Sequence, residues 1–310
     1  MRAALLDAPD ALPRIADVSA PKSQSGLVPV AMRAAALTNL DRAVAEGRHY
    51  LSTAEWPHRI GREGVGDHRL ERVFVTAASI PSPLGSFADH VLAAPQALLP
   101  VPDSIDDVSA AAIGNAGLAA WLALSWRARV LPGETVLVLG ATGASGGIAV
   151  TAARLLGAGH IVAAGRNPER LAQLARDGAD ATVCLGDDLA PRLQDAAPLG
   201  FDIVIDFLNG TPAEDSMRSM RPGGRLVQVG GSAGRETRVE AQLARRLNLD
   251  VLGFAYYHAP PDVQRKAYVD LCEAKVAGKV SLAFKTVPID DIAEAWTAHR
   301  ETGQRYVLEF

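Results

Sequence analysis

The chain has 310 residues, of which 48% are hydrophobic and 21% charged, and its formal net charge is -4. This length suggests two domains, and the composition is that of a globular chain rather than a disordered one. Because the small negative charge offers no basic field for a phosphate backbone, nucleic acid is excluded as a default partner and a small molecule is favoured.

The cysteines and the apolar runs of the sequence indicate the cellular compartment in which we expect the protein. The cysteines, Cys184 and Cys272, lie far apart in the sequence. This spacing matches neither a disulfide framework nor a zinc ribbon, so we expect a cytoplasmic protein. The first residues lack the continuous apolar run of a signal peptide. No apolar stretch approaches the 18 or so residues that span a bilayer, so we also expect no membrane partner.

The first hundred residues are rich in proline and glycine. Short apolar stretches, such as 27–31, 73–76 and 86–93, lie between these breakers. This pattern predicts a small, irregular, β-rich domain. From Val108 the sequence becomes an alanine-rich helix, and we place the domain boundary near Ile113. The predicted first domain is therefore 1–113.

From residue 134 onward apolar runs alternate with helical segments. Short, near-continuous apolar strands separated by helices predict a parallel sheet covered on both faces, and hence an α/β doubly wound domain over 114–255. The predicted strands fall at 135–140, 160–165, 181–185, 201–210, 224–231 and 249–255. The remaining segment, 256–310, predicts helices and a last strand, RYVLEF, which we expect to return to the first domain and complete it.

A glycine-rich bend follows the first of these strands. It reads Ala141-x-Gly143-x-x-Gly146, with alanine at the first glycine of G-x-G-x-x-G. Small residues between a strand and a helix let the backbone approach a pyrophosphate, and the helix start offers free N–H groups and a partial positive charge. The position between strand and helix favours a dinucleotide site over a purely structural turn. The predicted contacts are Ala141, Thr142, Gly143, Ala144, Ser145 and Gly146.

The second strand ends in Gly165-Arg166-Asn167. An NAD-binding chain carries Asp or Glu here against the ribose hydroxyls, whereas a guanidinium can hold a 2′-phosphate through two parallel hydrogen bonds. We therefore predict that all three residues contact the cofactor and that NADPH is preferred over NADH. The alternative is a solvated loop arginine.

Several stretches together are similar to those of a known family. They are GREGVG (61–66), GSFADHVLAAPQALLPVPDSIDDVSAAAIGNAGLAAWLAL (85–124), GATGASGGIAVTAARLLGA (140–158), GGRLVQVGG (223–231) and IDDIAEAW (289–296). Over nearly its whole length the chain resembles the zinc-free quinone oxidoreductases of the medium-chain dehydrogenase/reductase superfamily. The resemblance implies a GroES-like β-barrel domain formed by both chain ends, a Rossmann domain between them, and a homodimer or sometimes a tetramer. It also implies that Gly230, Gly231, Phe254 and Ala255 lie near the nicotinamide.

The residues that match the zinc-binding members differ in their ligands. The first cysteine ligand corresponds to Thr38, and the family's Gly-His-Glu becomes Gly61-Arg62-Glu63. A catalytic zinc needs three protein ligands, so we predict no metal. The segment TNLDRAVAEGRHY resembles the family's N-x-x-D-x-x-x-x-x-G-x-Y, with Thr38 in place of the asparagine and Asn39 beside it. The resemblance makes Tyr50, Thr38 and Asn39 the candidate catalytic residues, although Tyr50 could equally be a packed tyrosine.

Hydride transfer without a Lewis acid favours an acceptor that is already electron-poor. We therefore predict NADPH-dependent, zinc-independent reduction of quinones or α,β-unsaturated carbonyls. One alternative is a zinc-free alcohol or acyl-chain reductase of the same superfamily. A second is a non-catalytic NADPH-binding sensor, or an RNA-binding protein as reported for some relatives, against which the net charge speaks.

Overall fold

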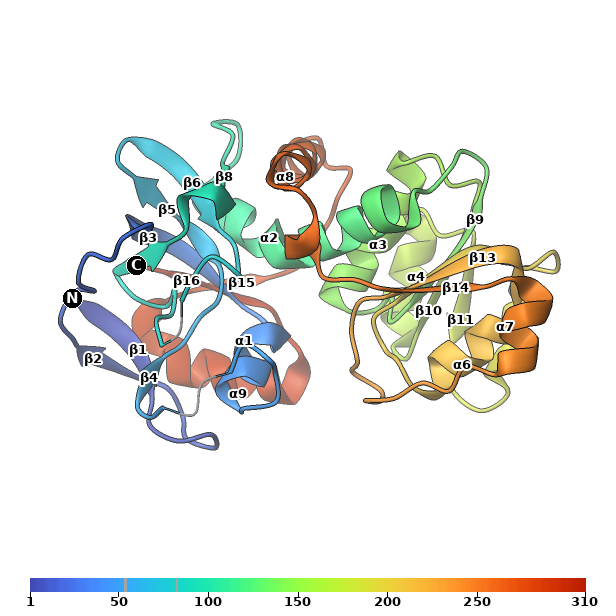
Figure 1. Cartoon of the computed structure of the whole chain (residues 1–310), viewed down its shortest axis with the longest axis horizontal. Helices are drawn as coiled ribbons and strands as arrows, with labels where there is room; N and C mark the ends of the chain where they lie inside the picture. The colour runs from blue at the N-terminus through green and yellow to red at the C-terminus, as the bar shows by residue number, and fades with distance from the viewer. Residues whose placement is uncertain (53–54, 82) are drawn as a thin grey trace. The chain divides into compact units, whose positions relative to one another are not determined.

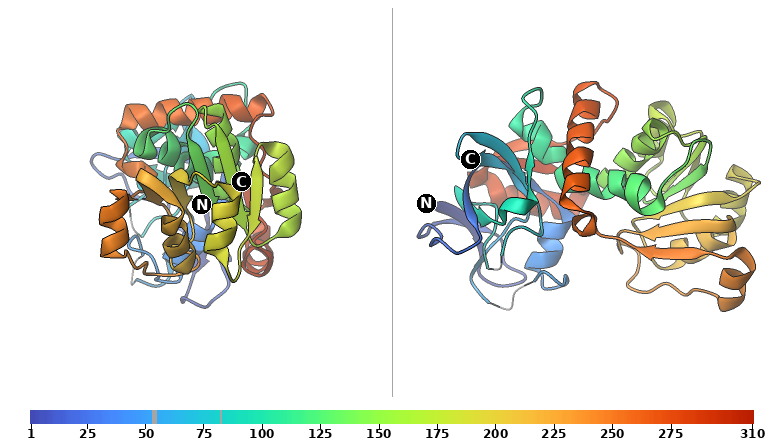
Figure 2. Two further views of the ribbon diagram at one scale, coloured as in Figure 1. Left: turned by 90° about the vertical axis from the view of Figure 1, so that its right-hand side faces the viewer. Right: turned by 45° about the horizontal axis from the view of Figure 1, so that its top comes forward.

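The computed structural model describes residues 1–52, 55–81 and 83–310, which divide into two compact units. Unit 1 comprises Met1–Asn115, Pro260–Ala277 and Leu282–Phe310, and unit 2 comprises Ala116–Ala259 and Gly278–Ser281. Both chain ends lie in unit 1 (Figure 1 and the right-hand view of Figure 2). Each unit is described by itself.

The core of unit 2 is a parallel sheet. Its strands are β9 (Thr135–Leu139), β10 (His160–Gly165), β11 (Ala181–Cys184), β12 (Phe201–Asp206), β13 (Met220–Gln228) and β14 (Asp250–Gly253). They pair in the order β11-β10-β9-β12-β13-β14, and each neighbouring pair is parallel. Every residue of β9 is buried, as a strand with protein on both faces requires. The predicted doubly wound sheet is confirmed.

Helices cover both faces of this sheet. They are α3 (Ala144–Leu155), α4 (Pro168–Asp177), α5 (Leu189–Ala196), α6 (Thr211–Arg218) and α7 (Ala241–Leu247). From β9 the chain moves to β10 and β11 in one direction, and from β12 to β13 and β14 in the other. Because such crossovers are right-handed, α3 and α4 lie on one face and α6 and α7 on the opposite face. Leu137 and Leu139 of β9 pack into the same apolar cluster as Met217 of α6 and Leu243 of α7.

Unit 1 is mainly antiparallel. Its strands are β1 (Arg2–Leu6), β2 (Arg14–Asp17), β3 (Val28–Leu37), β4 (His58–Arg59), β5 (Gly64–His68), β6 (Glu71–Val75), β7 (His90–Ala93), β8 (Leu98–Pro100), β15 (Lys285–Pro288) and β16 (Tyr306–Glu309). One sheet has the order β2-β1-β4, and another has the order β15-β16-β3-β5-β6-β8 with β7 also pairing with β3. Pairing of Tyr306 with Leu37 confirms that the last strand returns to the N-terminal part of the chain.

The helical segments of unit 1 connect and cover these sheets. They are α1 (Asn39–Ala45), α8 (Pro261–Val276), α9 (Ile292–Thr302) and the 3₁₀ turns η1 (Pro95–Ala97) and η4 (Ile289–Asp291). The 3₁₀ turn η3 (Tyr256–His258) belongs to unit 2. Ile289, Ile292 and Trp296 pack with Leu6 and Phe87 in the core of unit 1, which explains why the apolar residues of IDDIAEAW recur at helical spacing.

The alanine-rich segment corrects one sequence expectation. Helix α2 (Asp107–Leu122) continues into a π-helical turn, η2 (Ala123–Ala128). Within the described part of the chain, Asp107–Ala128 is long and apolar enough to cross a membrane, with a mean hydropathy of 1.4 over its best 18-residue window. The expectation that no stretch reaches this length was wrong, because a long alanine-rich helix can reach this mean hydropathy without a continuous run of bulky apolar residues. Since 72% of that window is buried inside the protein, the segment also fits a core helix.

Candidate functional site

The bend after β9 is closed too tightly for side chains. Gly140 has φ +80°, and a Cβ on Gly146 would lie 2.2 Å from the carbonyl oxygen of Gly140. Only glycine fits at position 146, since real Cβ atoms do not approach an oxygen this closely. Sequence reasoning did not include Gly140 among the candidate residues; its signal was the glycine at the strand end. At Gly146 the bend therefore presents backbone, rather than a side chain, at the edge of the sheet.

The start of α3 is open to an anion. Gly143 is its N-cap and has no side chain to cap the first turn. The N–H groups of Ala144, Ser145 and Gly146 therefore have no acceptor within the helix. Ala141 is buried, and its N–H donates to the carbonyl oxygen of Ala164 at 2.9 Å, which anchors the bend to β10. The predicted residues 141–146 thus form a cradle whose free donors suit a diphosphate.

The end of β10 lies beside this cradle. A Cβ on Gly165 would lie 2.4 Å from Cγ2 of Thr142, so the two strand ends pack directly. Arg166 is exposed, and Asn167 is the N-cap of α4, where its Oδ1 accepts from the N–H of Arg170 at 2.9 Å. The structure thus gives Asn167 a capping contact.

Arg170 is a candidate that sequence reasoning missed. One of its guanidinium nitrogens would lie 3.8 Å from a Cβ placed on Gly147, so this cation lies over the first turn of α3. The sequence signal that could have identified Arg170 is its position four residues after Arg166, in the helix that follows β10. The chain therefore carries two guanidinium groups at or near this strand end.

The remaining predicted cofactor residues follow β13 and β14. Gly230 comes two residues after β13, and a Cβ there would lie 2.9 Å from the carbonyl oxygen of Phe207. Gly231 is exposed. Phe254 follows β14, and its ring centroid lies 6.2 Å from that of Trp126; Ala255 is the N-cap of η3. Because parallel strands end at one edge, Arg166, the bend and Gly230 succeed one another along it, and β10 and β13 are about 14 Å apart.

In unit 1, Thr38 and Asp41 form hydrogen bonds with each other. Oδ2 of Asp41 accepts from the N–H of Thr38 at 2.7 Å and from its hydroxyl at 2.6 Å. The Thr38 hydroxyl oxygen also accepts from the N–H of Asp41, which completes a capping box for α1. Both side chains are buried. The hydroxyl of Thr38 therefore donates its only hydrogen bond to Asp41.

Asn39 and Tyr50 occupy more open positions. Asn39 is exposed, and its Oδ1 lies 3.2 Å from Nε2 of His299. Tyr50 is 72% exposed and its ring lies against His49, with centroids 4.0 Å apart. Partial burial raises the pKa of the Tyr50 phenol above its usual value, so it keeps its proton at neutral pH. Of the two candidates that carry a hydroxyl, Thr38 is buried and Tyr50 is accessible.

A buried charged cluster lies next to Asp41, and sequence reasoning did not foresee it. Glu63 is 1% exposed; its Oε2 accepts from the N–H of Asn115 at 2.9 Å, and its Oε1 lies 3.2 Å from Nη2 of Arg305. Burial raises the pKa of Glu63 to about 8, against the opposing charge of Arg305. Burial also raises the pKa of Asp41 to about 6, opposed by its bonds from Thr38 and by Arg62.

The side chain of Arg62 takes part in the same buried region. Its Nη2 donates to the carbonyl oxygens of Ala77 at 2.6 Å and Ile80 at 2.9 Å. Within the described ranges, no three His, Cys, Asp or Glu side chains form a group that could hold a metal. Arg62 and Thr38, which stand where zinc ligands would be expected, each bond to protein groups instead.

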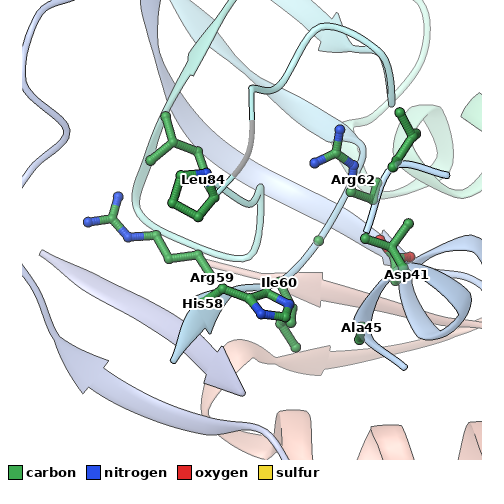
Figure 3. A pocket seen from close by; sticks show the side chains of 11 residues that line it. Asp41, Ala45, His58, Arg59, Ile60, Arg62 and Leu84 are labelled. Atoms are coloured by element: carbon green, nitrogen blue, oxygen red, sulfur yellow. The ribbon is translucent and has the colours of Figure 1, made fainter. Parts of the chain in front are cut away.

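A small cavity opens between α1 and the chain around Gly61 (Figure 3). Asp41, His58 and Arg62 line it, and its volume of about 10 Å³ holds about one water molecule. Nδ1 of His58 lies 3.1 Å from the carbonyl oxygen of Glu55, which can only accept, so Nε2 of the neutral ring is an acceptor. Burial lowers the pKa of His58 and favours this neutral form. The cavity is too small for an organic substrate.

Comparison with known proteins finds similarity to oxidoreductases and to segments of polyketide synthases. Residues 144–274 match the family described as "Zinc-binding dehydrogenase". The chain is 28% identical over 172 residues to "Quinone oxidoreductase-like protein 2" of Rattus norvegicus, covering 54% of this chain and 49% of that protein. It is 33% identical over 150 residues to a phenolphthiocerol/phthiocerol polyketide synthase of Mycobacterium tuberculosis, covering 47% of this chain. These matches span about half of the rat protein and 7% of the matched polyketide synthase chain.

A solved structure resembles the chain over its full length. The quinone oxidoreductase of Thermus thermophilus, described together with its complex with NADPH, has a TM-score of 0.79 and 27% sequence identity, covering 100% of both chains. This likeness confirms the expected fold, a GroES-like β-barrel domain plus a Rossmann domain. The roles of the individual predicted site residues stay predictions.

Proposed function

Because the chain is a quinone oxidoreductase-like protein of the medium-chain dehydrogenase/reductase superfamily, we propose that it is an NADPH-dependent, zinc-independent reductase of quinones or α,β-unsaturated carbonyls. The observation that carries the proposal is the tight bend in which a Cβ on Gly146 would clash with the carbonyl oxygen of Gly140, beside a strand end that carries Arg166 instead of a carboxylate. NADPH would supply the hydride.

Within unit 2, backbone and cations would share the work of holding the cofactor. The free N–H groups of Ala144, Ser145 and Gly146 suit the diphosphate. Arg166 and Arg170 lie on the β10 side of the bend, where a 2′-phosphate would be recognised by paired hydrogen bonds from a guanidinium. Gly230 and Gly231 follow β13, across β12 from the bend, and would bring backbone rather than side chains against the nicotinamide ring. The unit would thus hold the 2′-phosphate end of the dinucleotide by charge and the nicotinamide end by close backbone contact.

The zinc independence of the proposed reaction rests on the residues that are present. The hydroxyl of Thr38 donates a hydrogen bond to Asp41, and Nη2 of Arg62 donates to two carbonyl oxygens. Neither side chain is a metal ligand of the usual kind. An electron-poor acceptor needs only a proton after hydride transfer, and solvent or the protonated phenol of Tyr50 can provide it.

A second candidate function is reduction of an acyl chain. The similarity to segments of polyketide synthases supports it, although the matched region is a small part of those proteins. An enoyl thioester is itself an α,β-unsaturated carbonyl, so the two candidates differ in acceptor rather than in chemistry. A non-catalytic NADPH-binding sensor is the remaining alternative.

We also propose a cytoplasmic homodimer. In the described residues β14 is an edge strand of the unit 2 sheet, and an edge can extend by pairing with a second copy. Light scattering of the purified protein should then give twice the chain mass of 32.6 kDa.

The decisive experiment combines binding with turnover. Quenching or enhancement of NADPH fluorescence measures the affinity for NADPH and, in parallel, for NADH. Addition of 9,10-phenanthrenequinone, an enone or a crotonyl thioester then shows which acceptor oxidises the bound NADPH. Saturable NADPH binding and quinone or enone turnover above the protein-free rate is the expected result. Binding without turnover of any acceptor would favour the sensor, and no affinity for either nucleotide would refute the proposal.

A further inference from the structure

His49 lies in the turn that follows α1, and hydrogen bonds within the turn hold both its backbone and its ring. Its N–H donates to Oγ of Ser52 at 3.3 Å, and its carbonyl oxygen accepts from the N–H of Ser52 at 2.9 Å. Nδ1 of the ring accepts from the N–H of Leu51 at 3.2 Å. The direction of the imidazole is therefore set by residues 49–52 themselves.

The contact with Leu51 determines which ring nitrogen carries the hydrogen. A backbone N–H can only donate, so Nδ1 of His49 is the acceptor and the neutral ring carries its hydrogen on Nε2. Burial and the positive charge of Arg62 lower the pKa of His49, so the ring is neutral at neutral pH. His49 therefore presents an N–H donor at Nε2.

This donor is open to a bound molecule. In the part of the chain that the structure describes, no protein group accepts a hydrogen bond from Nε2 of His49. The residue is half-buried, and Nε2 is not one of the buried side-chain atoms that lack a partner, so this nitrogen keeps accessible surface. The partner of Nε2 is therefore water or a ligand.

The turn borders the residues that match the zinc-ligand positions. Leu51 lines the small cavity together with Asp41 and Arg62. Arg62, which replaces the histidine of the family's Gly-His-Glu, is close enough for its charge to act on the ring of His49. An accessible N–H donor thus lies near the position from which a metal ion would polarise the oxygen of an acceptor.

The spacing of the family pattern also leads to His49. In N-x-x-D-x-x-x-x-x-G-x-Y the last position comes two residues after the glycine, and in this chain that residue is His49, two after Gly47. Tyr50, the candidate that the resemblance suggested, lies one residue further along the chain and is 72% exposed. The polar position of the pattern therefore carries an imidazole here.

We propose that His49 is a catalytic residue that donates a hydrogen bond from Nε2 to the carbonyl oxygen of the quinone or enone; this assignment rests on the proposed function. When the acceptor takes up hydride with its electron pair, NADPH becomes NADP⁺ and negative charge develops on the acceptor oxygen. The bond from Nε2 strengthens as this charge grows, while the imidazole keeps its proton. Solvent supplies the proton that completes the reduction.

Two substitutions at position 49 separate the donor from the turn. His49→Asn places an amide oxygen near the position of Nδ1, where it can accept from Leu51, but puts nothing at the position of Nε2. His49→Gln reaches the position of Nε2 with an N–H donor but does not replace the Nδ1 acceptor. The two variants therefore keep opposite halves of the imidazole's bonding.

The turnover experiment uses NADPH and 9,10-phenanthrenequinone. His49→Asn should lower kcat about a hundredfold with KM within about threefold, as expected when one donor to a developing oxyanion is lost. His49→Gln should keep kcat within about tenfold of the wild type. If the ring only held the turn, His49→Asn would instead be the more active variant, and the proposal would be overturned.

A matched control and the folding of the variants accompany this comparison. His68→Asn removes another imidazole of unit 1, whose Nδ1 lies 3.0 Å from the carbonyl oxygen of Pro29, and should keep kcat within about threefold. Thermal melting and NADPH fluorescence titration should give wild-type values for every variant. A large loss in Tyr50→Phe together with full activity of His49→Asn would assign the contact to Tyr50 and overturn the proposal.

Nuclear magnetic resonance tests the contact without turnover. Two-bond ¹H–¹⁵N spectra report the tautomer of each imidazole, and the signals missing from His49→Asn identify His49. Its ring should be neutral with the hydrogen on Nε2, and the Nε2 signal should shift when 9,10-phenanthrenequinone is added to the protein with NADP⁺. A hydrogen on Nδ1, or an Nε2 signal that saturating quinone leaves unmoved, would overturn the proposal.

Failure of this assignment can be told from failure of the proposed function. Wild-type oxidation of NADPH by the quinone with an unchanged rate in His49→Asn would refute the role of His49 and uphold the reductase. A wild type that neither binds NADPH nor oxidises it would refute the reductase, and the catalytic role of His49 with it.

Discussion

At the carboxyl edge of the unit 2 sheet, the groups offered to a ligand are backbone N–H groups left free by the start of α3. Around Glu63 in unit 1, the polar groups are buried side chains whose partners lie within the protein: the carboxyl of Glu63 accepts from the N–H of Asn115 and pairs with Arg305. The edge depends on side chains being absent, since a Cβ on Gly146 would lie 2.2 Å from a carbonyl oxygen. The cluster depends on a partner being present, and that partner, Arg305, is 242 residues away in the sequence.

This difference predicts which property a substitution in each region should reduce. A methyl group added to the edge should remove ligand binding, whereas a charge removed from the cluster should remove stability. The two regions can therefore be tested with opposite kinds of substitution and different measurements.

The largest expected effect is on the cluster. At pH 9, above the Glu63 pKa of about 8, replacing Arg305 by Met leaves the ionised carboxyl of Glu63 buried without its cation, and breaking a buried pair in this way costs about 3 to 5 kcal/mol of unfolding free energy. Urea unfolding measures the loss. Lys266→Met is the matched control, because Lys266 pairs with Asp270 at 2.7 Å but its side chain is 76% exposed; it should cost less than about 1 kcal/mol. Similar losses for both variants would contradict the assigned role of burial.

The next effect is on the edge. Gly146→Ala forces a methyl group against the carbonyl of Gly140, so the bend must open and lose its free donors. We expect NADPH affinity to fall by about a hundredfold or more, equivalent to about 2.7 kcal/mol. In Gly147→Ala the nearest atom would be 3.6 Å away, an ordinary contact, so this neighbour should bind within about threefold of the wild type. Fluorescence titration compares them, and equal affinities would mean that the bend is not the cradle.

Stability should also depend on pH through Glu63 of the cluster. The folded protein holds the Glu63 proton up to a pKa of about 8, whereas the unfolded carboxyl loses it near 4.5, so folding takes up a proton between these values. Unfolding free energy should therefore decrease as pH rises from 6 to 8, by at most about 1.4 kcal/mol per pH unit. The decrease should level off above pH 8. Urea unfolding at four pH values checks this, and Glu63→Gln, which does not titrate, should flatten the slope. If the slope persists in that variant, a group other than Glu63 takes up the proton on folding.

The sequence predicts the edge well because its determinants are local. The bend from Ala141 to Gly146 lies between a strand and a helix within one short stretch, and parallel strands necessarily end together. The same rule placed Arg166 and Gly230 at that edge without any knowledge of distances. What the sequence did not reveal is which glycine carries the positive φ, namely Gly140, and that Arg170 reaches over α3.

The cluster could not be predicted in the same way. Thr38 and Asp41 form a capping box that T-x-x-D allows, but the family resemblance pointed to Thr38 as a catalytic candidate instead. The pairing of Glu63 with Arg305 depends on β16 returning to β3, and a strand pattern does not state which charged residues meet. Burial converts these residues into a fixed network, and burial of individual side chains is a tertiary property.

The smallest expected effect distinguishes cofactors at the edge. Arg166→Ala removes an exposed guanidinium without touching the bend, so it should leave stability unchanged and weaken NADPH by about tenfold, about 1.4 kcal/mol, through loss of contact with the 2′-phosphate. NADH, which lacks that phosphate, should lose less than about twofold. Arg176→Ala, an exposed arginine near the far end of α4, is the matched control and should change neither affinity. Equal weakening of both nucleotides would mean that Arg166 supports the backbone cradle rather than selecting the cofactor, and the contrast between a backbone edge and a side-chain selector would fail.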